Sequence, residues 1–138
     1  QQISYDRQLA YKKQHVTDAM RHIGRLKDVR VLDVIPSDRV FEYRNKMEFS
    51  CSAQQWLLPE ALEDETIKKD FGIGLHVPGT FDKVIDIQQC DIMPMLGNRI
   101  LADVRAFIKT SGLPAYHLKT HEGFWRFLML RHSVAHDT

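Results

Sequence analysis

The stretch from Phe41 to Ser52, FEYRNKMEFSCS, alternates apolar and polar residues and constrains the fold more than any other part of the chain. Successive side chains of a strand point to opposite faces, so this pattern predicts one strand with an apolar face and a polar face. Such a strand belongs to an antiparallel sheet with one buried and one solvated side. Arg44 and Lys46 would then lie together on the polar face, where Glu42 and Glu48 could balance them as an ordinary solvated surface.

Two helical patterns and further strands complete the predicted fold. Apolar residues recur at helical spacing over residues 5–23 and again over residues 98–111, where a stripe of Ile100, Leu101, Val104, Phe107 and Ile108 should face the sheet. Strands are expected at residues 29–35, in a hairpin over residues 71–87, and at residues 124–134. The last is apolar on both faces and is therefore expected inside the sheet. The predicted class is α+β, an antiparallel sheet packed by two main helices.

Length and composition limit the chain to one core and exclude several functions. A chain of 138 residues with 43% hydrophobic side chains buries a single core of useful size. Its net charge of +1 argues against nucleic-acid binding by bulk charge, although a local basic patch remains compatible. Two distant cysteines and the absence of a long apolar run favour a reducing cytoplasm and no membrane span.

The predicted hairpin and the histidine pairs carry the residues that could suggest a cofactor, nucleic acid or metal. Gly72 and Gly74 lack the third glycine and the following helix of a dinucleotide fingerprint, so they are interpreted as strand glycines under a neighbouring segment. Phe81, beside Lys83 near the hairpin tip, could stack on a base or fold back over the sheet edge. The pairs His117/His121 and His132/His136 have zinc-like spacing, but their loop and strand composition disfavours zinc.

Four segments in order resemble one family of enzymes. The segments are QQISYDRQLAYKKQHVTDAMRHIG, YRNKMEFS, FGIGLHVPGTFDKVIDIQQC and THEGFWRFLMLRHS, and together they resemble the central region of bacterial RumA-type RNA uracil-5-methyltransferases. That family uses S-adenosylmethionine to make 5-methyluridine, usually in 23S ribosomal RNA. Its members have an N-terminal TRAM domain, this central region and a C-terminal Rossmann-like catalytic domain. The resemblance therefore implies a fragment with no catalytic residue and no S-adenosylmethionine site of its own, whose partners are RNA and the two other domains.

The resemblance also assigns roles to particular residues. It makes Cys90 the counterpart of the fourth thiolate of a four-iron four-sulfur cluster found in some members, with the other three cysteines upstream of this chain. It divides the chain into a linking helix over residues 1–24 and a central domain over residues 25–138, and implies self-association if that helix lacks its usual cover. It favours RNA contact by a set of basic, polar and aromatic residues, namely Arg44, Asn45, Lys46, Phe81, Lys83, Arg126 and Arg131. The alternative is a structural module that braces the catalytic domain without touching RNA.

Overall fold

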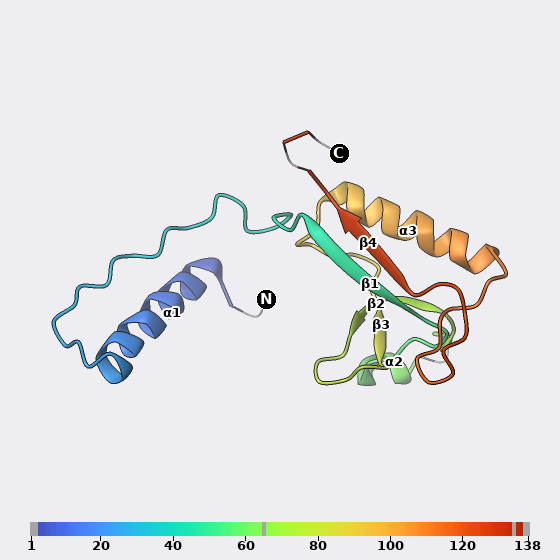
Figure 1. Ribbon diagram of the computed structural model, residues 1–138, viewed down its shortest axis with the longest axis horizontal. Helices are drawn as coiled ribbons and strands as arrows, with labels where there is room; N and C mark the ends of the chain where they lie inside the picture. Colours follow the sequence, from blue (N-terminus) through green and yellow to red (C-terminus); the bar gives the residue numbers. More distant parts are fainter. Residues whose placement is uncertain (1–2, 65, 134, 137–138) are drawn as a thin grey trace. The chain divides into compact units, whose positions relative to one another are not determined.

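A computed structural model of the chain describes residues 3–64, 66–133 and 135–136. The chain divides into two compact units between Val40 and Phe41 (Figure 1). The proposed division into a linking helix and a central domain concerns the intact protein and stays a prediction.

The first unit is a helix followed by an extended segment. Helix α1, Tyr5–Asp18, continues into a π-helical turn, Ala19–Ile23, so the predicted helix over residues 5–23 is present. Neither element has a buried residue. The strand predicted over residues 29–35 is wrong, because this segment has no ladder partner and Lys13 Nζ instead forms an ion pair with Asp33 at 2.6 Å. A β-rich composition cannot make a strand without a neighbour that completes its hydrogen bonds.

The second unit is a four-stranded antiparallel sheet with one helix across it (Figure 1). The strands are β1, Lys46–Ser52; β2, Gly72–His76; β3, Val84–Asp86; and β4, Phe127–Arg131. Their order is β3-β2-β1-β4. Helix α3, Met95–Thr110, packs on one face, and a short helix α2, Pro59–Leu62, lies in the excursion between β1 and β2. The predicted α+β class is confirmed.

Strand β1 is shorter than the sequence pattern predicted. Met47, Phe49 and Cys51 are buried as expected, but Phe41 and Tyr43 are exposed. Glu42 has a φ of +54°, outside the range of a strand, and the Arg44 N–H donates to the Ile92 carbonyl rather than to a sheet neighbour. The alternation over residues 41–45 is thus coincidental, and Arg44 lies before the strand instead of on its polar face beside Lys46.

The position of β4 also corrects the sequence prediction. It was expected inside the sheet, but in the order of the described strands it lies at the edge, next to β1. Leu128 and Leu130 contact the core, whereas Phe127 and Met129 on the other face are 50% and 47% exposed. An apolar residue on both sides of a strand therefore marks, in this case, an uncovered apolar surface rather than an interior strand.

The hairpin formed by β2 and β3 is confirmed, as is the tight approach at its glycines. A Cβ on Gly74 would lie 2.0 Å from the Ile85 carbonyl oxygen, and one on Gly72 would lie 2.7 Å from Gln55 Cβ. Any larger residue would therefore push these neighbours away. The two glycines let adjacent segments close over this end of the sheet.

The core lies between the sheet and α3. Phe49, Ile73 and Leu101 are completely buried, and Met47, Met93 and Ile108 surround them. The predicted helical stripe is correct for Leu101, Val104 and Ile108, whereas Ile100 and Phe107 are 37% and 61% exposed. In the described residues no helix is long and apolar enough to cross a bilayer.

Arg105 on α3 was not anticipated as a core residue. It is buried, and its Nε lies 3.2 Å from Asp86 Oδ1 on β3 while its guanidinium also donates to the Ile87 carbonyl. Asp86 Oδ1 in turn accepts the Ile73 N–H at 2.9 Å. This buried ion pair fastens the helix to the edge of the sheet.

Candidate nucleic-acid interface

The face of the sheet opposite α3 carries the residues that most resemble a binding surface. We call it the open face: Lys46, Glu48, Ser50 and Ser52 of β1, His76 of β2, and Phe127, Met129 and Arg131 of β4. Cross-strand partners point the same way, so the register places Lys46 against Arg131, Glu48 against Met129 and Ser50 against Phe127. One polar and aromatic surface thus runs along β1.

Two cations meet at one end of the open face. Lys46 and Arg131 are direct cross-strand partners and both are exposed. Within the described part of the chain neither forms an ion pair with a carboxylate. Like charges placed opposite one another reduce sheet stability, so this pair is suited to an external anion rather than to folding.

The residues beside this pair come from the segment before β1. Arg44, Asn45 and Arg131 line a small cavity of about 100 Å³ together with Met93 and Leu130. The Asn45 carbonyl accepts the His132 N–H at 2.8 Å, which continues the pairing of β1 with β4. Four of the seven predicted RNA-contact residues, Arg44, Asn45, Lys46 and Arg131, are therefore gathered at this end.

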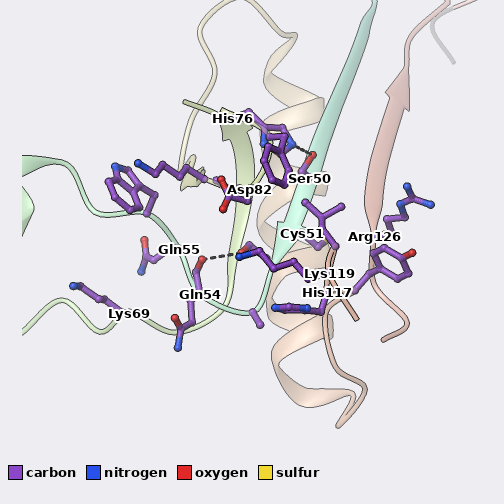
Figure 2. A pocket seen from close by; sticks show the side chains of 18 of the residues that line it. Ser50, Cys51, Gln54, Gln55, Lys69, His76, Asp82, His117, Lys119 and Arg126 are labelled. Atoms are coloured by element: carbon purple, nitrogen blue, oxygen red, sulfur yellow. Dashed lines mark hydrogen bonds between the residues drawn. The ribbon is translucent and has the colours of Figure 1, made fainter. Parts of the chain in front are cut away.

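The other three predicted residues line a larger cleft at the opposite end of β1. Phe81, Lys83 and Arg126 border a cleft of about 730 Å³ whose floor includes Ser50 and Ser52. Three segments form its walls, and Figure 2 shows side chains from each: Gln54 and Gln55 after β1, His76 and Asp82 from the hairpin, and His117 and Lys119 before β4. The separation between Lys46 and Ser50 along β1 is roughly 13 Å from strand geometry.

Backbone hydrogen bonds hold these walls in place. The Trp56 N–H donates to the Val84 carbonyl at 2.6 Å, and the Val77 N–H donates to the Lys83 carbonyl at 2.9 Å. In the wall before β4, the Tyr116 N–H donates to the Trp125 carbonyl at 2.7 Å. The cleft is therefore built from braced segments, although each is a loop in the sequence.

The cleft is more basic than the whole chain. Lys69, Lys83, Lys119 and Arg126 line it, against the single carboxylate of Asp82. None of the four cations forms an ion pair with a described carboxylate. The net charge of +1 for the chain hides this local excess, because acidic residues are distributed elsewhere.

Several cleft residues were missed in the sequence. Trp56, Tyr116 and Lys119 come from stretches with no periodic pattern, and His76 lies at the end of a predicted strand, so only their basic or aromatic chemistry could have marked them. The Lys83 ammonium lies 3.9 Å from the centre of the Trp56 ring, a contact between residues far apart in sequence. No spacing rule links such positions.

The two histidine pairs with zinc-like spacing both lie in the described part of the chain. Among residues 3–64, 66–133 and 135–136, no three His, Cys, Asp or Glu side chains gather as ligands. His117 Nδ1 accepts the Thr120 N–H at 3.2 Å, and His121 Nδ1 lies 2.9 Å from the Tyr116 hydroxyl, so both stabilise a loop.

The two cysteines are free thiols in the core. Cys90 is buried, and its backbone is paired with the Asn98 side-chain amide through bonds of 2.8 and 3.2 Å. One thiolate cannot hold an iron–sulfur cluster, so the described residues do not fit the cluster by themselves and the role of Cys90 stays a prediction. Burial raises the pKa of the Cys51 thiol to about 11, which makes it unreactive at neutral pH.

Comparison with known proteins shows which proteins this chain is similar to. No family model matches the chain. It is 40% identical over 98% of its length to an uncharacterised RNA methyltransferase of Chlorobaculum tepidum, and 30% identical over 95% of its length to a tRNA (uracil(54)-C(5))-methyltransferase of Pyrococcus horikoshii. The chain is homologous to one segment of these RNA methyltransferases. It spans 28% and 26% of the length of these two relatives.

A solved structure supports the fold of this RNA methyltransferase segment. The tRNA (uracil-54, C5)-methyltransferase of Pyrococcus abyssi, in complex with S-adenosyl-L-homocysteine, superposes with a TM-score of 0.67 at 21% identity. The match covers 98% of this chain and 28% of that one. This structure supports the fold, and the sequence relatives confirm the resemblance to RNA methyltransferases that the four segments indicated.

Proposed function

We propose that this chain is the RNA-positioning region of an S-adenosylmethionine-dependent RNA uracil-5-methyltransferase that makes 5-methyluridine. The observation that carries the proposal is the open face: cations without an ion-pair partner among the described residues lie at both ends of β1, and an aromatic cleft lies at the Ser50 end. Phosphates need exposed Lys and Arg, and unpaired bases need aromatic surfaces on which to stack. The kinship with RNA methyltransferases supports RNA as the polyanion.

The reaction itself belongs to residues outside this segment. S-adenosylmethionine would supply the methyl group, and the relatives' solved structure holds the corresponding product, S-adenosyl-L-homocysteine. The work of the described residues is to bind the RNA backbone and orient the strand. We place this work in the cytoplasm, where the RNA substrate is found.

The proposed substrate is 23S ribosomal RNA, with transfer RNA as the alternative because the Pyrococcus relatives are named for it. The decisive measurement is the 5-methyluridine content of both RNAs from cells lacking the gene, before and after treatment with the full-length protein and S-adenosylmethionine. New 5-methyluridine in 23S ribosomal RNA supports the proposal. Modification of transfer RNA alone would correct the substrate, and modification of neither would overturn the activity.

A second candidate role is a brace for another domain without RNA contact. Phe127 and Met129 favour it, since both are large apolar side chains left exposed on the open face, and a covering domain would bury them. Ultraviolet crosslinking of the full-length protein to its RNA, with the peptides identified by mass spectrometry, separates the two roles. Crosslinks in residues 44–52, 81–83 or 116–131 support RNA positioning, and crosslinks confined to other parts of the protein support the brace.

A further inference from the structure

The cleft at the Ser50 end of the open face has features that phosphate binding alone does not require. Its lining combines four aromatic side chains with the basic ones: Trp56, Phe81, Tyr116 and Phe127. We propose that it holds one unpaired nucleotide of the RNA, with the base stacked on an aromatic side chain and the phosphate held by Lys119 and Arg126. This inference rests on the proposed function and specifies the form of RNA that the face accepts.

The aromatic side chains are available for stacking. Phe81 is 68% exposed at the hairpin tip, Trp56 is 42% exposed, and Phe127 is half exposed on the edge strand. An apolar ring of this size is normally buried, so three of them around one cleft form a surface that water solvates poorly. A nucleobase covers such rings and is indifferent to sequence, because every base has a π-face.

Two of the four cleft cations, Arg126 and Lys83, are already positioned by aromatic rings. Arg126 lies 4.7 Å from the centre of the Tyr116 ring and 5.0 Å from that of Phe127, and Lys83 lies 3.9 Å from that of Trp56. Cation–π contacts orient the charged groups without neutralising them, unlike contacts with carboxylates. His76 is also fixed, since its Nε2 lies 2.9 Å from the Ser50 hydroxyl. An entering phosphate would meet donors that need little reordering.

Size and shape favour an unpaired nucleotide over a duplex. A volume of about 730 Å³ lies within the range of sites for small organic ligands, which is roughly 300–1,000 Å³. Bases inside an A-form duplex are stacked on one another, so their faces are not free to stack on the rings that line the cleft. A splayed base from a loop or a single strand can. The Lys46–Arg131 pair, about four residues along β1, would then hold the adjoining backbone.

The test compares cleft variants with matched controls on the opposite side of the sheet. We would change Phe81→Ala and Lys119→Ala in the full-length protein, with Phe107→Ala and Arg99→Ala on α3 as an aromatic and a basic control. Phe107 and Arg99 are exposed and lie outside the cleft. Affinity would be measured by fluorescence anisotropy for a single-stranded RNA and for a fully paired RNA duplex.

We expect each cleft variant to weaken single-strand binding about fivefold or more while duplex binding stays within twofold, because stacking and phosphate contacts are lost only for the unpaired strand. The two control variants should bind both RNAs like the unsubstituted protein. Photocrosslinking with 5-iodouridine in the single strand should mark Trp56, Phe81 or Phe127.

The outcomes separate this inference from the proposed function. If the protein methylates RNA but the cleft variants bind single strands normally, the nucleotide site is wrong and the proposed function stands. If no methylation is found and the cleft variants still lose single-strand binding, the site stands and the proposed function is wrong. Competition by adenosine monophosphate at the concentration at which the RNA strand binds would show a free-nucleotide pocket and overturn the inference.

Discussion

The two faces of the sheet are built from the same strands but are organised by different forces. The covered face buries Phe49, Ile73 and Leu101 completely and fixes one charged residue, Arg105, by an ion pair with Asp86. The open face places Lys46 and Arg131 opposite each other and exposes Phe127. The buried charge of Arg105 is thus compensated inside the fold, whereas Lys46 and Arg131 have no ion-pair partner among the described residues.

The contrast indicates how the chain separates stability from binding. Burying a charge without a partner is energetically costly. Arg105 can be buried on the covered face because the Asp86 carboxylate and the Ile87 carbonyl both accept hydrogen bonds from it. A solvated charge costs little, so the open face can carry uncompensated cations for an external ligand. The predictions below test this separation, beginning with the change that should disturb folding most.

The largest effect is expected from Arg105→Met. This change leaves the Asp86 carboxylate buried without its cation, and removing one member of a buried pair lowers the free energy of unfolding by about 3–5 kcal/mol. The matched control is Lys109→Met on the same helix, where the ion pair with Asp70 is exposed and 3.9 Å long. It should cost no more than about 1 kcal/mol. Urea denaturation followed by circular dichroism measures the free energy of unfolding of both variants. Equal decreases for the two would show that the buried ion pair stabilises the fold no more than the exposed one.

The reach of sequence reasoning follows the same division. Met47, Phe49 and Cys51 were predicted as buried because alternation reports directly on one face of a strand. Arg105 was not, because its burial depends on Asp86, which is 19 positions away and on another element. The hairpin followed from Pro78-Gly79, but the edge position of β4 did not, since pairing order is a property of the whole sheet.

The candidate site shows the same limit. Phe81, Lys83 and Arg126 were proposed from their local chemistry, and the fold places them around one cleft. The sequence pattern paired Lys46 with Arg44 on one strand face, and this prediction was wrong. Arg44 precedes the strand, and the cationic neighbour of Lys46 is Arg131 on β4. A sequence states which residues are basic or aromatic. Which of them meet depends on register, which is set by long-range packing.

An intermediate effect concerns the pH dependence of the covered face. The Cys51 thiol has its pKa raised from 9.0 to about 11 by burial, so the folded state keeps it protonated where the unfolded chain has already lost the proton. Its contribution to stability is complete below pH 9 and is lost as pH rises through 11. Between pH 8 and pH 10 the free energy of unfolding should fall by about 1 kcal/mol more than in Cys51→Ala. Urea denaturation of both proteins at pH 8 and pH 10 measures this difference. An equal fall in the free energy of unfolding for the two proteins would show that burial does not raise the pKa of the Cys51 thiol.

The smallest effect on folding is expected where the effect on binding is largest. In Lys46→Gln/Arg131→Gln two like charges that face each other across β1 and β4 are removed, so the free energy of unfolding should stay constant or rise by up to about 0.5 kcal/mol. RNA affinity at low salt should fall, and the slope of log affinity against log salt should flatten by roughly 1.4 if each cation contacts one phosphate of a single strand. Arg99→Gln, an exposed cation on α3, should change neither quantity. Loss of stability together with an unchanged salt slope would mean that Lys46 and Arg131 serve the fold, and the division of roles between the two faces would then be wrong.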